Sequence, residues 1–399
     1  MKKSISLYVH IPFCVQKCLY CDFLSTDKES YAAKLQYVDA LTTEIGLYKN
    51  LADRYLVRTI FFGGGTPTSL DGAFIECILE AIRSVFEVAE DAEITIEANP
   101  GTIKYSDLQT FIANGINRLS IGLQTTNDSL LGRIGRIHNY DQFLAGYNLA
   151  RRAGFENINI DIMSGLPTQN LHDLAETLEV VTDLKPEHIS VYSLQVEDGT
   201  PLSKDDELLE RIPSEEEDRA MYAMTKKVLF AKGYQRYEFS NYSLPGKECK
   251  HNLVYWTGGE YLGFGLGAAS YFKGERFSNI RDLHLYIDQM EEAKLKEAEI
   301  RDKNTYYEIF TEKLRTERTT MYIDRRMEEF MFLGLRMTNG VSKEDFQRKF
   351  EKDMFDVYGE VIYKYIREGY MLDTGDRVQF TDRGIDVSNY ILSEFLLDS

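Results

Sequence analysis

Three cysteines stand close together near the N-terminus, in the run HIPFCVQKCLYCDF. Cys14, Cys18 and Cys21 follow the spacing C-x3-C-x2-C, and the chain has only two other cysteines. Clustered thiols in a long chain indicate a metal or cluster site rather than a disulfide framework, because an odd number of thiols cannot pair off. Thiolates are the usual ligands of iron–sulfur clusters, and a four-iron cluster held by three thiolates keeps one iron free for another ligand.

A zinc site is the alternative that this spacing leaves open. His10 precedes Cys14 by the same separation that divides Cys14 from Cys18, so the ligands of a Cys3His zinc site are present. Spacing alone favours the cluster and the zinc ion equally. The rest of the chain has to decide between them.

Further polar and glycine motifs follow apolar runs in the first half of the chain. The run GGGTP at 63–67 follows TIFF, and a glycine run after a buried strand lets a ligand approach the backbone closely. It is not a Walker-type phosphate loop, because no Gly-Lys-Ser/Thr follows it. Glu97 ends the alternating run EITIE, Gln124 follows RLSIGL, and Asp161 lies in NIDI.

The elements that position these residues are predicted as an alternation of strands and helices. Runs rich in β-branched and aromatic residues predict strands at 6–10, 59–62, 93–97, 118–122, 157–162 and 188–193. Helical patterns lie between them at 37–51, 74–86, 105–114, 140–153 and 171–184. Six such units predict an α/β fold, a partial, open (β/α)6 barrel with a parallel sheet. The motifs would then meet at the carboxyl ends of the strands, where parallel barrels bind substrate.

The second half of the chain has a different texture. The charge-dense stretch 203–219 is expected to be the solvated start of a helix. We divide the chain into a barrel at 1–235, an aromatic- and glycine-rich connector at 236–320, and a C-terminal domain at 321–399. Helices followed by a short hairpin predict that this last domain is helical and winged-helix-like.

Composition limits the classes of function. The 399 residues carry 46 Lys and Arg against 64 Asp and Glu, a net charge of −18, so we expect no nucleic-acid partner. No signal peptide and no membrane span is expected, and a cytoplasmic location follows from the reduced thiols. Cys77 is expected to be a buried small residue and Cys249 an incidental thiol, and neither is expected to be a ligand.

Read together, these motifs resemble a known superfamily. With Tyr20 just before the last cysteine, the triad resembles the signature of radical S-adenosylmethionine (SAM) enzymes, in which SAM chelates the open iron. The runs YVHIPFC, FFGGGTPT, IEANPGT, GINRLSIGLQ and NIDIMSGLP resemble the coproporphyrinogen dehydrogenase-like branch over nearly the whole chain. Asp22-Phe23 replaces a glycine and a fourth cysteine of the oxidase, and the oxidase's N-terminal arm is expected to be absent. The run HNLVYW at 251–256 is similar to the HNxxYW motif that is linked with heme binding in heme chaperones of the HemW type.

The resemblance implies a role for particular residues. It gives the [4Fe–4S] cluster the ligands Cys14, Cys18 and Cys21. It gives SAM the contacts Tyr8, Tyr20, Gly64, Gly65, Thr66, Glu97, Gln124, Arg136 and Asp161, with Arg133 as a substitute for Arg136. It makes His251 an axial heme ligand with Tyr255 and Trp256 packed on the macrocycle, and His10 a second candidate beside the cluster.

The function that the resemblance implies is heme delivery to respiratory hemoproteins, some of them in the membrane. The alternative is oxygen-independent oxidative decarboxylation of coproporphyrinogen III. A third interpretation, heme degradation by a related methyltransferase, has no specific residue in its favour. A zinc module would leave GGGTP, Glu97, Gln124 and Asp161 unexplained. The sequence leaves open whether SAM is cleaved, which second ligand the heme has, whether a homodimer forms and whether the chain touches a membrane.

Overall fold

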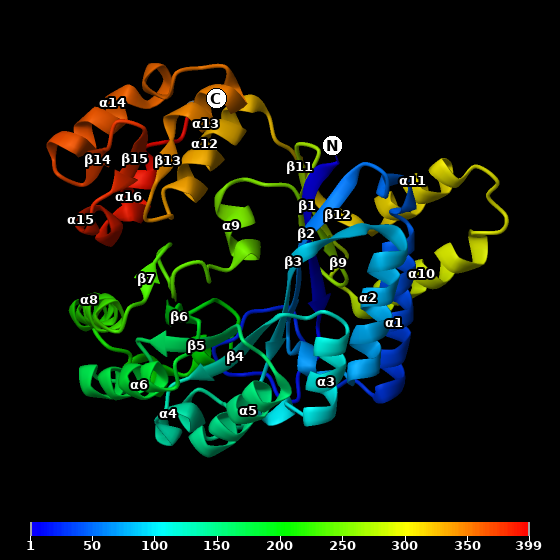
Figure 1. The fold of residues 1–399 in the computed structure, drawn as a ribbon, viewed down its shortest axis with the longest axis horizontal. Helices are drawn as coiled ribbons and strands as arrows, with labels where there is room; N and C mark the ends of the chain where they lie inside the picture. Colours follow the sequence, from blue (N-terminus) through cyan, green and yellow to red (C-terminus); the bar gives the residue numbers. More distant parts are fainter. Residues whose placement is uncertain (1, 398–399) are drawn as a thin grey trace.

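A curved sheet organises the molecule, which a computed structural model describes for residues 2–397. Its twelve strands have the order β12-β11-β10-β9-β1-β2-β3-β4-β5-β6-β8-β7, with no contact between the two outermost strands. The first six in the chain are parallel: β1 (Lys3–Ile11), β2 (Tyr55–Gly64), β3 (Glu87–Ala98), β4 (Arg118–Gln124), β5 (Ile158–Ser164) and β6 (His188–Ser193). Figure 1 shows this sheet bending round with its helices on the outside. The expected open, partial (β/α)6 barrel is confirmed.

Helices connect the parallel strands on the outer face. They are α1 (Tyr31–Gly46), α2 (Gly72–Val85), α3 (Tyr105–Ala113), α4 (Asp128–Arg133), α5 (Tyr140–Ala153), α6 (Leu171–Asp183), α7 (Asp206–Leu209) and α8 (Glu215–Ala231). Helix α1 begins six residues before its expected start, because the Ser30 side chain caps it by accepting from the Ala33 N–H. The charge-dense stretch does begin a helix: Ser214 and Glu217 form a capping box at the start of α8.

The two faces of the sheet have opposite chemistry. Side chains alternate along each strand, so the apolar set packs outward against the helices, as Leu119 and Ile121 do in β4. The intervening residues point inward and are polar yet buried, as Arg118 and Ser120 are. Polar groups in such surroundings need partners or a ligand. The inside of the barrel is therefore built for polar chemistry.

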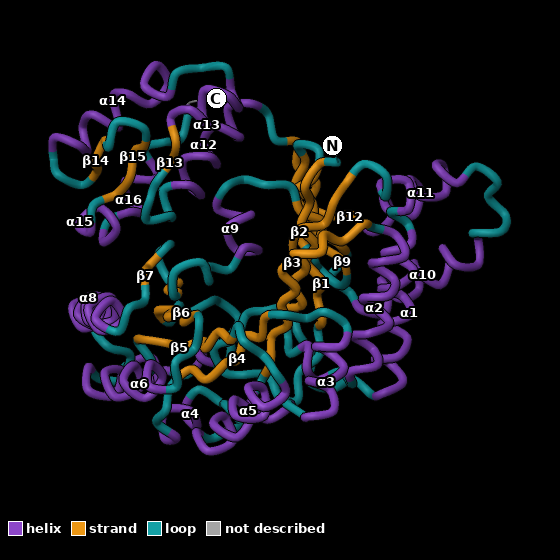
Figure 2. The backbone as a smooth tube through the Cα atoms, in the orientation of Figure 1, coloured by secondary structure: helices purple, strands orange, loops and turns teal. Residues whose placement is uncertain are grey.

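The segment expected to be a connector is in fact part of this sheet. β7 (Gln235–Arg236) and β8 (Asn241–Ser243) extend it beyond β6, and β9 (Tyr261–Phe264) pairs in parallel with β1. β10 (Ala269–Phe272), β11 (Glu275–Asn279) and β12 (Arg315–Thr320) then add antiparallel strands, and α9 (Lys250–Trp256), α10 (Leu283–Lys296) and α11 (Lys303–Leu314) complete the segment. Figure 2 shows β9 beside β1 and β7 near β6, at the two ends of the parallel strands. The pattern was hard to detect because most of these strands have only two to five residues.

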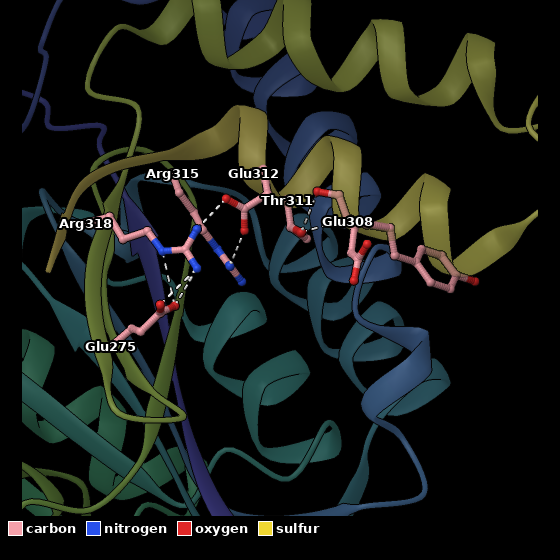
Figure 3. A network of polar contacts seen from close by, with 7 residues as sticks. Glu275, Glu308, Thr311, Glu312, Arg315 and Arg318 are labelled. Carbon is pink, nitrogen blue, oxygen red and sulfur yellow. Dashed lines mark hydrogen bonds and ion pairs between the residues drawn. The ribbon is translucent and has the colours of Figure 1, made fainter. Parts of the chain in front are cut away.

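A charge network joins the outermost strand to its neighbours (Figure 3). Arg318 of β12 pairs with Glu275 of β11 at 2.7 Å and with Glu312 of α11 at 2.6 Å, and Arg315 also pairs with Glu312. These side chains are partly exposed, from 14% for Arg315 to 48% for Glu312, so solvent screens the pairs and each adds modest stability. Their position at the sheet edge fixes how β12 and α11 meet.

The C-terminal domain has a hydrophobic core of its own, formed by residues from Met327 to Phe395. Its helices are α12 (Ile323–Gly334), α13 (Lys343–Phe350), α14 (Met354–Arg367), α15 (Asp382–Asp386) and α16 (Ser388–Ser393). Its three-stranded sheet has the order β13 (Val341–Ser342), β15 (Arg377–Phe380), β14 (Met371–Asp373). Helices with a small antiparallel sheet fit the winged-helix-like prediction.

Two sequence expectations about the remaining features can be compared with the structure. Within the described residues no helix is both long and apolar enough to cross a bilayer. The expectation that Cys77 is buried was wrong, because it is exposed on α2, whereas Cys249 is fully buried before α9.

Candidate functional site

A cavity of about 400 Å³ opens at the carboxyl ends of the parallel strands. This volume lies in the range of roughly 300–1,000 Å³ that small-molecule sites occupy. Of the residues predicted to bind the cluster and SAM, all except Tyr8 line it: Cys14, Cys18, Cys21, Tyr20, Gly64, Gly65, Thr66, Glu97, Gln124, Arg136 and Asp161. Residues far apart in the sequence thus meet in one place.

The cysteine loop follows β1 and lies on one side of this cavity. The Cys14 N–H donates to the Thr26 carbonyl, and the Cys21 N–H turns back to the Cys18 carbonyl at 3.3 Å. Burial raises the pKa of the Cys14 thiol, and it raises that of Cys21 to about 11. Iron would overcome this cost, because a coordinating thiol is deprotonated outright.

Two neighbours donate to the sulfur atoms. The Thr66 hydroxyl lies 3.7 Å from Cys14 Sγ, and the Arg136 guanidinium lies 3.5 Å from Cys18 Sγ. Donors of this kind stabilise thiolates and tune a bound cluster. Arg136, rather than Arg133, lines the cavity and has this position.

The geometry does not favour the zinc alternative. Both ring nitrogens of His10 are engaged away from the thiols, Nδ1 with the Tyr8 hydroxyl at 3.1 Å and Nε2 with the Leu24 carbonyl at 2.8 Å. Among residues 2–397 no three His, Cys, Asp or Glu side chains converge tightly enough to hold a single ion. The same two hydrogen bonds leave His10 no nitrogen for heme iron.

The glycine run gives the cavity its close backbone wall. Gly64 has a φ of +115°, which L-residues rarely adopt, and it donates its N–H to Glu97 Oε2 at 3.2 Å. A Cβ on Gly65 would lie 3.0 Å from Cys14 Sγ and 2.8 Å from the Phe13 carbonyl oxygen. Side chains are excluded here, so a ligand can reach main-chain groups beside the cysteine loop.

The far wall is polar. Gln124 ends β4 with a φ of 77°, a strained backbone of the kind found at functional sites. Asp161 accepts from Ser120 Oγ at 3.0 Å and from Asn159 Nδ2 at 2.8 Å. Ser120 and Tyr192, which also line the cavity, were not predicted; they sit on inward positions of β4 and β6, and the strand alternation alone could have found them.

Tyr8 and His251 belong to a second, smaller cavity of about 180 Å³ inside the barrel. Glu97, Ser120, Asp161 and Tyr192 line both cavities, so the two adjoin. His251 is only 1% exposed, and its ring stacks on Phe61 with centroids 5.1 Å apart.

Helix α9 carries the HNxxYW run and is anchored to β3. Glu93 accepts from the N–H groups of Lys250 and His251 at 3.1 and 3.0 Å, where the partial positive charge of a helix N-terminus favours a carboxylate. His251 Nδ1 bonds Thr59 Oγ1 at 2.7 Å, and Nε2 bonds the Tyr255 hydroxyl at 2.9 Å. Axial ligation of heme would therefore require the imidazole to give up one of these bonds.

In this structure His251 and Trp256 line different cavities, so the expectation that His251, Tyr255 and Trp256 share one macrocycle stays a prediction. His251 and Tyr255, four residues apart, face the barrel interior, whereas Trp256 lies about 100° further round the helix. Trp256 lines a different cavity, between α9 and the C-terminal domain. The motif thus presents two faces to two sites.

A buried carboxyl predicts how stability depends on pH. Burial, with nearby Asp161, raises the pKa of Glu97 to about 8, above its ordinary 4.5. Between these values the folded state holds a proton that the unfolded state releases, so this group's contribution to stability falls as pH rises. Glutamine at position 97 does not titrate, so the variant Glu97→Gln escapes this loss. The thermal midpoint of the variant minus that of wild type should therefore be several degrees larger at about pH 8.5 than at about pH 5.

The control is Glu90→Gln, which replaces an exposed glutamate of the same strand. The difference in thermal midpoint between this variant and wild type should be the same at both pH values. An equal difference from wild type at both pH values for Glu97→Gln would show that Glu97 is already ionised at the lower pH.

Comparison with family models identifies two parts of the chain. Residues 8–181 match the model described as the radical SAM superfamily, and residues 324–387 match the HemN C-terminal domain. The first match includes the cysteine loop and every rim residue named above except Tyr192.

Curated proteins match over the full length. The chain is 35% identical to the heme chaperone HemW of Lactococcus lactis, covering 100% of this chain and 99% of that protein. It is 35% identical to HemW of Bacillus subtilis (98% and 99%) and 33% identical to HemW of Escherichia coli (99% and 98%). The solved structure of coproporphyrinogen III oxidase HemN from Escherichia coli, described as a radical SAM enzyme, superposes with a TM-score of 0.83 at 25% identity. That match covers 99% of this chain and 90% of the oxidase.

Proposed function

Because the chain belongs to the HemW family of heme chaperones, within the radical SAM superfamily, we propose that it binds heme and delivers it to proteins that require it. The observation that carries this proposal is its relatedness to these chaperones along its whole length, including the HNxxYW run. A shared barrel alone would not suffice, since one fold can host several functions.

The family's cofactors are a [4Fe–4S] cluster and SAM, and the rim residues fit both. Three thiols beside donors from Thr66 and Arg136 suit a cluster with one open iron. When bound, the cluster supplies one-electron chemistry to SAM.

The protein's own groups would hold and orient SAM. We propose that the Gly64–Gly65 backbone and Thr66 bind its amino-acid end, and that Glu97 and Asp161 accept hydrogen bonds from its hydroxyl groups. Tyr20, Gln124 and Arg136 would close the cavity around it, and Tyr8 would support Glu97 from the inner cavity. The left-handed backbone at Gly64 and Gln124 supports this, because such strain is typical of binding sites.

Coproporphyrinogen III decarboxylation is the second candidate, and the superposition with the oxidase favours it. Asp22-Phe23 counts against it, because the oxidase has a glycine and a fourth cysteine there. Phe23 is 63% exposed and lines the cavity beside the cysteines, so it gives the cluster surface an apolar cover in place of a thiol.

Recipients, compartment and assembly belong to the same proposal. We infer that respiratory hemoproteins receive the heme, including membrane-bound ones reached by peripheral contact. Five free cysteines and an oxygen-sensitive cluster fit the reducing cytoplasm. His251 as an iron ligand and the pairing of two copies stay predictions.

Heme titration tests the proposal. The apoprotein should take up about one equivalent of heme per chain with a distinct Soret band, because the fold offers sites of ligand size beside aromatic side chains. Absorbance and equilibrium dialysis measure it, with heat-unfolded chain as the control. Uptake no greater than that of the unfolded chain would contradict heme binding.

A further inference from the structure

A cavity of about 400 Å³ separates α9 from the C-terminal domain, away from the cluster. We name it the seam cavity. It is lined by Trp256, Thr257, Phe330, Gly334, Met337, Gly340, Val341, Ser342, Asp345, Arg348, Lys349 and Arg377. Figure 1 shows α9 between the barrel and α12, and these two helices are in contact.

One wall of the seam cavity is aromatic, and it carries a buried hydrogen-bond donor without a partner. Trp256, the chain's only tryptophan, lines it together with Phe330. The indole Nε1 is buried and has no hydrogen-bond partner among the described residues. A buried donor without a partner is costly and calls for an explanation. Arg336 packs 4.7 Å from the indole ring, so the wall is held rigidly in place.

Two cations, Lys349 and Arg377, also line the cavity, and Lys349 Nζ lies 5.8 Å from the centre of the Phe330 ring. Lys349 donates to the Gly258 carbonyl at 3.2 Å, and Arg377 donates to the carbonyls of Asn339 and Gly340 at 2.7 and 2.8 Å. Within residues 2–397 no carboxylate oxygen lies within 4.0 Å of either cation. Burial lowers the pKa of Lys349, and neighbouring Arg326 adds to this effect, while Glu329 and Asp345 oppose it.

Unpaired cations are unexpected in a chain with a net charge of −18. An ammonium has three donors and a guanidinium five, so both cations keep donors for an anion. Arginine and lysine are the groups that bind carboxylates best. An aromatic surface beside two such cations fits a flat, apolar ligand with carboxylate arms.

We propose that the seam cavity binds heme, with the macrocycle against Trp256 and Phe330 and its propionates on Lys349 and Arg377. This inference rests on the proposed function, and it assigns heme to the Trp256 face of the HNxxYW run. His251 then acts as a positioning residue that holds α9 through Thr59 and Tyr255. Arg348 at the mouth is 73% exposed, so a ligand here stays near the surface, where a recipient can reach it.

The test combines protein variants with a modified ligand, in the full chain. Lys349→Gln and Trp256→Leu should each weaken heme affinity roughly tenfold, because a charge-assisted bond or an aromatic contact is lost. Lys352→Gln removes a nearby exposed lysine outside the cavity and should bind as wild type. Heme dimethyl ester, which lacks free carboxylates, should bind wild type more weakly and be insensitive to Lys349→Gln.

His251 provides the opposing outcome. His251→Gln should keep the wild-type Soret position, since heme does not touch it, and should weaken heme affinity less than Lys349→Gln or Trp256→Leu does. Loss of the Soret shift in His251→Gln, with heme affinity unchanged in Lys349→Gln and Trp256→Leu, would overturn the inference and restore His251 as the ligand. Failure of wild type to bind heme would instead contradict the proposed function. The cluster content of each variant shows whether it is folded. If Trp256→Leu does not fold, the comparison of heme with its dimethyl ester still tests the inference.

Discussion

Alanine replacement of Cys14, Cys18 and Cys21 is expected to abolish the broad iron–sulfur absorption of the anaerobically reconstituted protein. These thiols are the cysteines that line the rim cavity, so the cluster has no other thiolate to use. Wild type should hold about four iron and about four sulfide per chain. Iron and sulfide analysis with absorbance spectroscopy measures the effect.

Cys77→Ala is the matched control, because this exposed thiol on α2 lies outside the cavity. It should keep the full cluster. Each single variant at the triad should lose most of the cluster, since a cubane held by two thiolates has two exposed irons. Stoichiometric zinc without sulfide in anaerobically purified wild type would overturn the cluster and return the site to the zinc alternative.

The sequence predicted the parallel strands and the rim well because both depend on local pattern. Strand alternation and the position of Glu97 near the end of β3 required only period-two burial and the convergence of parallel strands, whereas Asp161 lies in the middle of β5 rather than near its predicted end. The barrel could be inferred from six repeats of one unit. The edge strands could not, because β7 and β8 are too short to show a period.

The site around α9 was harder to predict, for a different reason. The contacts that orient His251 come from Thr59 and Glu93, which are more than 150 positions away in the sequence. No local pattern indicates that Glu93 caps α9. The opposite directions of His251 and Trp256 follow from helix geometry, but the run HNLVYW alone does not state that it is helical.

The two cations of the seam cavity could not be predicted from the sequence either. Lys349 and Arg377 sit on α13 and β15, in a domain that composition described only as acidic and helical. Their distinguishing property is the lack of a nearby carboxylate, which appears only after folding brings α9 against α12.

The most direct test of the central claim compares two activities of one anaerobic preparation that holds cluster and SAM. Heme-loaded protein is mixed with a heme-free respiratory cytochrome b, and coproporphyrinogen III turnover is measured in parallel. We predict transfer of about one equivalent of heme per chain, faster than from free heme, and no detectable decarboxylation. Robust decarboxylation without heme transfer would contradict the account and identify the chain as an oxidase.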